Sequence, residues 1–241
     1  ETETGDVTDT LETGQAVLLR AQRSGAITPN PRGDAANARE WPRLVVEGLS
    51  PNVEGGDFAV KRVVGDTVTV EARVFADGHE QLAAELQWRA ADEAEWRAVP
   101  MTAIDADSWA AEFVPVRLGA HEFRVEGWLD HFGGFTRDFR KKLIAGVAQP
   151  VDRQEGLALI EAAAKRSEGA LGEDLTDLAE RIEAADEDDK SALLLDDRTA
   201  ELMARADDRP HSLHSQVQRL DAERLAARFS SWYELFPRSI T

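Results

Sequence analysis

The chain has 241 residues, of which 42% are hydrophobic, with six Trp and nine Phe, so we expect a globular protein of one or two domains with a substantial core. Its formal net charge of −18 repels phosphate backbones and anionic lipid headgroups, which argues against nucleic acid and membranes as partners. Because the sequence contains no Cys, disulfides, thiolate nucleophiles and Cys-based metal sites are excluded.

No stretch is long and apolar enough to cross a bilayer, which takes roughly 20 residues. The opening residues, ETETGDVTDT, lack the basic start and apolar middle of a secretory signal, so we expect a cytoplasmic protein. The chain has 5 Lys against 23 Arg, beside 46 Asp and Glu. Two explanations of this balance stay open: adaptation to high salt, which screens the repulsion between carboxylates, and an Arg-favouring genome.

Residues 1–40 are rich in Glu, Asp, Thr, Gly and Asn, and only residues 10–22 have an apolar pattern that supports a turn or two of helix. We predict a mostly disordered acidic leader over 1–40. Because the chain opens on Glu1 and not on Met, its limits need not be those of the natural protein. Order is expected to begin near Leu44, where a compact apolar run starts.

Residues 41–145 show the pattern of an immunoglobulin-like antiparallel β-sandwich. In the clearest strand, over 67–75, apolar and polar residues alternate, which is typical of a half-buried strand. The Asp77-Gly78 pair that follows is a strong turn signal. Six or seven short strands joined by turns rich in Gly, Asp and Pro are typical of this architecture. The strands are expected over 44–46, 67–75, 82–88, 96–101, 109–113, 121–127 and 135–143.

At Pro150 the spacing of apolar residues changes from two to three or four, which predicts helices within 146–227. Asp152 is placed to cap the first helix, with Glu155 three residues later. Amphipathic segments joined by short polar links predict a small bundle, with segments marked by 157–164, 171–182, 193–203 and 213–225. The expected fold class is therefore α+β: a β-sandwich domain over 41–145 followed by a small α-helical bundle domain over 146–227.

Three stretches of the sequence have distinctive motifs. Residues 43–89 contain Lys61-Arg62-Val63-Val64-Gly65 and then Val-Phe-Ala-Asp-Gly-His at 74–79, and a basic pair follows at 141–142. The segment RFSSWYELFPRS at 228–239 is too apolar for a frayed terminus and is predicted to be a strand of a larger body. Together these stretches resemble the N-terminal region of the α-1,4-glucan:maltose-1-phosphate maltosyltransferases of the α-amylase-like glycoside hydrolase superfamily.

Members of that family begin with a β-sandwich, continue through a helical bundle and enter the catalytic barrel through a strand like Trp232–Ser239. The resemblance thus implies that 228–241 is the start of a barrel that this chain lacks. In these enzymes an Asp and a Glu of the barrel pass maltosyl units from α-maltose 1-phosphate to an α-1,4-glucan with retention of configuration. None of those positions lies in this chain, so the resemblance implies no catalytic residue, no cofactor and no activity of the chain alone.

What the resemblance implies for this chain is an accessory and dimerisation region. Its partners would be a second copy, bound through the sandwich and the bundle, and its own catalytic barrel, with α-1,4-glucan as a further candidate. The alternative is a stand-alone carbohydrate-binding β-sandwich module. Fold alone does not separate the two functions.

Aromatic residues are the side chains of this sequence that could bind a sugar, because sugars stack on exposed rings. Trp88, Trp96 and Trp109 align with apolar partners at a period of two and are expected in the core. Trp128 alternates with Glu126 on what the pattern makes a polar face. It is therefore the one candidate for a glucan or subunit contact, and no other substrate-binding residue is predicted.

Three other polar clusters are interpreted as structural. His211 and His214 lack a third ligand at matching spacing, so no metal site is predicted. The run Asp186–Asp189 lacks the Gly and the terminal Glu of a calcium loop and is expected to be a solvated linker. Lys61 and Arg62 point to opposite faces of a strand and cannot clamp a phosphate together, so an interdomain ion pair is expected there.

Overall fold

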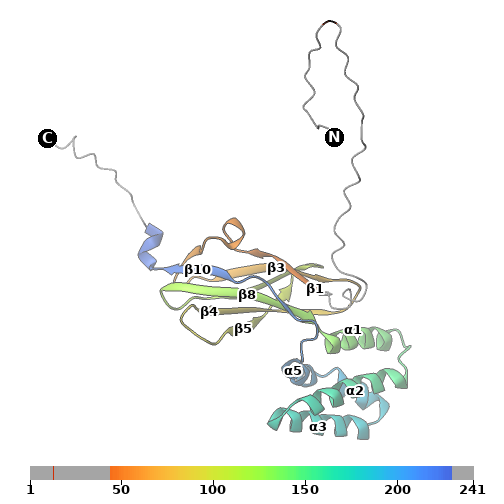
Figure 1. Ribbon diagram of the computed structural model, residues 1–241. Helices are drawn as coiled ribbons and strands as arrows, with labels where there is room; N and C mark the ends of the chain where they lie inside the picture. Colours follow the sequence, from red (N-terminus) through yellow and green to blue (C-terminus); the bar gives the residue numbers. More distant parts are fainter. Residues whose placement is uncertain (1–12, 14–43, 230–241) are drawn as a thin grey trace, which may run out of the picture. The chain divides into compact units, whose positions relative to one another are not determined.

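A computed structural model describes Thr13 and residues 44–229 of the chain (Figure 1). Apart from Thr13, the predicted leader over 1–40 lies outside the described residues, as does all but the first two residues of the predicted strand over 228–239. The described part is a mixed α+β fold with two sheets. A set of α-helices follows most of the strands, and the last two strands, which belong to one of the sheets, come after the helices.

One sheet is antiparallel, with its strands in the order β1, β3, β7, β6. In the central β3 every second residue from Val68 to Val74 is buried, which confirms the strand predicted over 67–75. The turn predicted at Asp77-Gly78 follows it, with Gly78 at a φ of 96°. The bounds of these strands are β1 Leu44–Ser50, β3 Val68–Ala76, β6 Thr102–Ala103 and β7 Ser108–Phe113.

The other sheet has the order β2, β10, β8, β4, β5, with the short β9 also paired to β8. Its neighbours run antiparallel except β2 and β10, which are parallel, so the prediction of a purely antiparallel sandwich is wrong at this pair. The bounds are β2 Val60–Val63, β4 Leu82–Ala90, β5 Arg97–Pro100, β8 Gly119–Leu129, β9 Leu213–His214 and β10 Gln218–Glu223. Short 3₁₀ helices occur at Glu54–Gly56 (η2) and Leu225–Phe229 (η3).

β10 corrects the prediction of a fourth bundle helix over 213–225. Gln218, Leu220 and Ala222 are buried while the residues between them are not, which is a period of two and not of three or four. The strand adds to the open edge of β8 and returns the chain to the sandwich after the helices. The elements therefore do not divide at 146 and 227, because helix begins before the first limit and strand returns before the second.

The two sheets share one hydrophobic core. The ring of Trp88 stacks on Phe113 with centroids 4.9 Å apart, and Phe113 lies 5.9 Å from Phe123 of the opposite sheet. Trp109 is buried in the same core, so the structural roles predicted for Trp88 and Trp109 are confirmed.

Trp96 differs from the other two. It precedes β5 and is only half-buried, and two guanidiniums contact its ring, those of Arg89 at 4.4 Å and Arg124 at 4.5 Å from the centre. The prediction that Trp96 belongs to the core is wrong. Its ring is held on the outer face of the sheet by cation–π contacts instead.

The segment predicted as a last strand over 135–143 is a helix, α1 His131–Ile144. Phe135, Phe139 and Leu143 recur every four residues and pack in the core of the bundle. This spacing places them on one face of a helix, which a strand would not do. Asp130 caps α1 by accepting a hydrogen bond from the Gly133 N–H at 2.7 Å.

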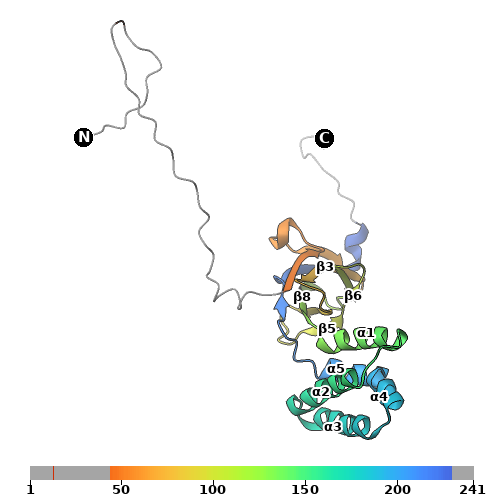
Figure 2. The ribbon, with the colours of Figure 1, turned by 90° about the vertical axis from the view of Figure 1, so that its right-hand side faces the viewer.

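Four further helices complete the bundle, and the two views show them grouped with α1 (Figures 1 and 2). They are α2 Pro150–Arg166, α3 Gly169–Ala184, α4 Glu187–Leu194 and α5 Asp197–Arg205. The single segment predicted over 193–203 is thus divided between α4 and α5, because Asp196 caps α5 by accepting from the Arg198 N–H. None of the helices described between 131 and 205 has the length and apolar character that a membrane crossing requires.

The cap predicted at Asp152 and the linker predicted at Asp186–Asp189 also differ in detail. Asp152 lies inside α2 and not before it, and its carboxylate accepts from the Gln149 N–H at 2.7 Å, so it caps the helix without Glu155. Asp186 is not simply part of a solvated linker. It caps α4 by accepting from the N–H groups of Asp188 and Asp189 at 3.1 and 2.9 Å.

Candidate functional site

The predicted contact residue Trp128 lies in β8, opposite Ala83 of β4. Only 8% of its surface is exposed, and its Nε1 donates a hydrogen bond to Asp207 Oδ2 at 2.6 Å. The guanidinium of Arg209 lies 4.3 Å from the centre of the ring. The prediction that Trp128 stands on an exposed face is therefore wrong, because the segment that follows α5 folds over the ring and removes it as an open platform for a sugar.

Next to Trp128, two carboxylates face each other across the sheet. Glu85 of β4 and Glu126 of β8 are paired in register, and they are only 9% and 6% exposed. Like charges directly opposite each other on a sheet repel, and burial removes the water that would screen them. A pair of this kind needs a cation within hydrogen-bond distance.

Arg209 supplies that cation. Its Nη1 and Nη2 donate to the two carboxylate oxygens of Glu85 at 3.0 and 2.8 Å, and Nη1 also donates to Glu126 Oε2. Gln87 lies between the acids and donates to Glu85 at 3.1 Å and to Glu126 at 2.9 Å. We call Glu85, Gln87, Glu126, Trp128 and Arg209 the Arg209 cluster.

Contacts within the Arg209 cluster shift the pKa values of its charged side chains. Burial alone would raise the pKa of Glu85, but hydrogen bonds from Arg209 and Gln87 outweigh it and hold the pKa below its ordinary value. The hydrogen bond to Glu85 in turn raises the pKa of Arg209. His214 of β9 lies 3.8 Å from Glu126, and burial, followed by the charge of Arg124, lowers its pKa. This shift favours the neutral ring of His214, so the residue does not share the role of Arg209.

A second cation reaches the cluster indirectly. Arg124 of β8 donates from Nε to Gln87 Oε1 at 2.8 Å, and the amide of Gln87 passes this contact on to the two acids. Two carboxylates are thus matched by two guanidiniums, one direct and one through an amide. Such a matched network stabilises a fixed arrangement of side chains, and it leaves no unpaired group of these side chains for acid or base chemistry.

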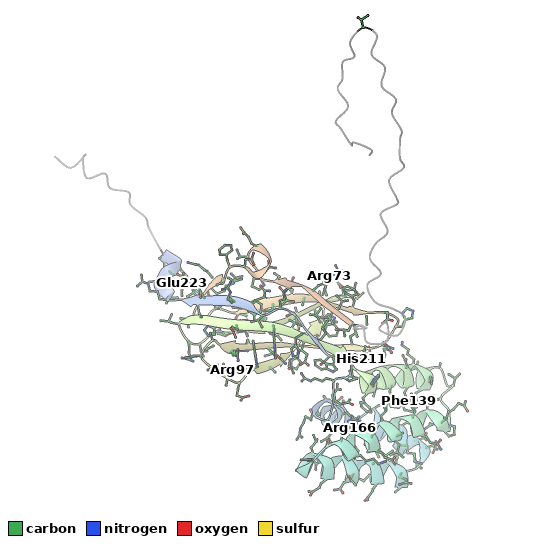
Figure 3. All side chains as sticks on the ribbon, viewed as in Figure 1. Arg73, Arg97, Phe139, Arg166, His211 and Glu223 are labelled. Carbon is green, nitrogen blue, oxygen red and sulfur yellow. The ribbon has the colours of Figure 1, made fainter. Side chains whose placement is uncertain are left out.

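Two cavities, of about 500 and 370 Å³, are both lined by Asp130 and His131. The larger lies between the turn before β4 and the helices α1 and α2, and the smaller lies between the sheet and the helices. Cations in their walls are paired with neighbouring acids: Arg137 lies 2.9 Å from Asp138 in the larger cavity, and Arg166 lies 3.5 Å from Asp208 in the smaller. Burial raises the pKa of Asp130. Figure 3 marks Arg166 on the helices and His211 on the segment that returns to the sheet.

The other residues singled out in the sequence lie elsewhere. His211 precedes β9 and His214 lies in it, so the two do not share a helix face. Within residues 44–229, no three His, Asp or Glu side chains are grouped as metal ligands. Lys61 pairs with Glu223 at 3.0 Å, but Glu223 belongs to β10 of the same sheet. The predicted ion pair therefore exists, and its interdomain character was wrong.

The central residue of the cluster, Arg209, was missed by sequence reasoning. It is separated from Glu85 by 124 positions, and the segment 206–212 carries no periodicity that would place it on a sheet. Glu85 and Glu126 gave no separate signal, because each falls on the polar side of the alternation of its strand. Nothing in the alternation identifies their partner.

Comparisons with known proteins bear directly on the resemblance seen in the sequence. Residues 42–224 match the family model for domain N/S of α-1,4-glucan:maltose-1-phosphate maltosyltransferase. Proteins of that name from Burkholderia pseudomallei and Pseudomonas aeruginosa are 37% and 36% identical to this chain, over 95% and 84% of its length. The protein of that name from Myxococcus xanthus is 37% identical over 81%.

The chain spans only 22% of the Burkholderia protein and 31% of each of the other two. The similarity therefore concerns one region of much longer proteins, and the N-terminal resemblance predicted from the motifs is confirmed. On the strength of the match over 42–224, this chain belongs to the domain N/S family of the α-1,4-glucan:maltose-1-phosphate maltosyltransferases.

Proposed function

We propose that this chain is the accessory region of a maltosyltransferase, which packs on the enzyme's own catalytic part and joins two copies of the enzyme. The observation that carries the proposal is the match of 42–224 to domain N/S, together with the small share of each relative that the chain spans. The relatives are named for transfer between maltose 1-phosphate and α-1,4-glucan. In this proposal that chemistry belongs to the rest of the enzyme. An immunoglobulin-like sandwich and a cytoplasmic location stay predictions.

An exposed apolar surface near the end of the family match supports a contact with the rest of the enzyme. The segments 115–118 and 225–229 both contact the turn at Gly65-Asp66. Gly65 donates a backbone hydrogen bond to the Pro115 carbonyl at 2.9 Å, and Asp66 forms an ion pair with Arg228. Large exposed apolar patches on soluble proteins often mark contact surfaces. The exposed residues of these segments are Val116, Leu118, Leu225 and Phe229.

A second exposed apolar surface lies at the corner between α1 and α2, and we propose it as the contact with a second copy. Ile144, Val147 and Val151 are 82%, 57% and 64% exposed. Gly146, at a φ of 68°, and the backbone hydrogen bond from Val147 to Lys142 keep the corner compact. Three neighbouring apolar side chains on a rigid corner form a surface that a symmetric contact would bury.

Replacing Ile144 with Glu is expected to weaken self-association about 100-fold, because a carboxylate in an apolar contact loses its hydration without gaining a partner. Sedimentation velocity over a range of concentrations measures the change. Ile104→Glu is the matched control, since Ile104 is 60% exposed but lies between β6 and β7, away from the corner. A monomeric wild-type chain, or equal weakening by both variants, would refute the proposed surface.

The chain alone is expected to release no phosphate from α-maltose 1-phosphate in the presence of maltooligosaccharides. A phosphate assay checks this, and the complete transferase serves as the positive control. Measurable turnover by the purified chain would contradict an accessory role. Titration of the same sample with maltooligosaccharides tests the alternative of a stand-alone carbohydrate-binding module, because saturable binding by a chain that does not self-associate would favour that module.

A further inference from the structure

The helices are inserted between two strands of one sheet. The chain leaves the sheet at the end of β8, passes through α1 to α5, and returns to pair with β8 again through β9 and β10. The buried apolar residues form two separate clusters, one in the sandwich and one among the helices. Because these cores are separate, the orientation of the helices on the sheet depends on polar contacts. These are the contacts at the two crossing points and those of Arg137 in α1, which donates to Gln81 Oε1 at 3.1 Å and to the His79 carbonyl at 3.3 Å.

We propose that Arg209 is a clasp that holds the helical bundle in one fixed orientation on the sandwich. The outgoing crossing is tied by backbone hydrogen bonds from Asp130 to Gln81 at 2.9 Å and from Leu129 to Pro210 at 3.1 Å. The second of these bonds joins the outgoing and returning segments directly. Arg209, which precedes Pro210, then fastens the returning segment to the sheet.

The backbone conformation at Arg209 is fixed by a local hydrogen bond. Its φ of 48° lies in the left-handed region that residues with a Cβ seldom adopt, and its N–H donates to Asp207 Oδ1 at 2.8 Å. The other oxygen of Asp207 accepts from the indole of Trp128. One carboxylate therefore fixes both the turn that carries Arg209 and the ring on which its guanidinium lies.

Moving the Arg209 guanidinium away from Glu85 and Glu126 would be unfavourable in free energy. With Arg209 withdrawn, Glu85 and Glu126 would remain opposed and buried, with Gln87 as their remaining shared donor within the cluster. Removing one partner of a buried ion pair is strongly destabilising, because it leaves an uncompensated charge in the interior. The closed arrangement is therefore strongly preferred, and it holds the α1–α2 corner at a constant angle to the sheet.

The test measures orientation separately from stability. Because the chain has no Cys, substitutions Glu71→Cys in β3 and Glu180→Cys in α3 give a unique pair of exposed sites for spin labels. Double electron–electron resonance on the full chain is expected to give one narrow distribution of the distance between the two spin labels. Adding Arg209→Met should broaden that distribution at least twofold.

Two further variants keep the test decisive. Arg219→Met removes an Arg from β10 of the same sheet, whose guanidinium contacts the Asp57 carbonyl and not the cluster, and it should leave the distribution narrow. Adding Glu85→Gln and Glu126→Gln to Arg209→Met removes the uncompensated charges, so thermal stability should recover while the distribution stays broad. A narrow distribution in this triple variant, or equal broadening by Arg219→Met, would overturn the proposal.

Discussion

Replacing Phe139 with Ala is expected to lower the free energy of unfolding of the helical bundle by about 3–5 kcal/mol. Phe139 is only 1% exposed and stacks on Phe135, with ring centroids 5.3 Å apart. The guanidinium of Arg153 in α2 lies 5.9 Å from its ring, so the side chain also joins α1 to α2. Its removal leaves a cavity that both helices border. Urea denaturation followed by circular dichroism measures the loss.

The loss should be confined to the helices, because the sandwich has a separate core. Hydrogen exchange is expected to show faster opening of amides in α1, α2 and α3, with little change in β3, β4 and β8. Phe58→Ala is the control, since Phe58 is 58% exposed and its loss should change stability by no more than about 0.5 kcal/mol. Faster exchange spread evenly over sheet and helices would contradict two separate cores.

The strands of the sandwich could be predicted because their signal is local. In β3 and β7 the alternation of apolar and polar residues along the chain is also the alternation of buried and less buried positions. The same rule failed for α1. After His131 its sequence has Phe132, a Gly-Gly pair and further Phe residues, which favour strand or turn by local propensity. Packing of α1 against α2 stabilises the helix in spite of these local propensities.

The partner of each strand could not be predicted, because pairing depends on contacts between distant segments. β10 pairs in parallel with β2, although the helices and most of the sandwich lie between them in the sequence. Its own period of two is present in the sequence, but the predicted bundle extends over this segment from the helices that precede it. Once β10 joins the sheet, Glu223 comes next to Lys61, and their ion pair follows.

The candidate site shows the same limit. Alternation correctly separates Trp128, Glu126 and Arg124 from the core face of β8. Exposure of that face was a further assumption, and it fails because residues after α5 cover one end of the strand. A period of two identifies which side chains share a face. It carries no information about what another part of the chain places on that face.

Replacing Gly156 with Ala is expected to destabilise the bundle by about 1–3 kcal/mol, although Ala is the better helix former. A Cβ at this position of α2 would lie 2.4 Å from Phe135 Cζ and 2.8 Å from Leu194 Cδ2. Neither neighbour moves easily, since the Phe135 ring is packed between two other Phe rings and Leu194 is fully buried. Thermal unfolding of the variant, compared with wild type, measures the effect.

Gly134→Ala in α1 is the matched control, because a Cβ there would meet only Gln81, at an ordinary contact distance of 3.5 Å. Without a clash, the lower chain entropy and higher helix propensity of Ala should stabilise the protein by about 0.4–1 kcal/mol. Opposite signs for the two substitutions would show that the close approach of α2 to Phe135 and Leu194, and not helix propensity, requires Gly156. Stabilisation by both would mean that α2 packs less closely than these distances indicate.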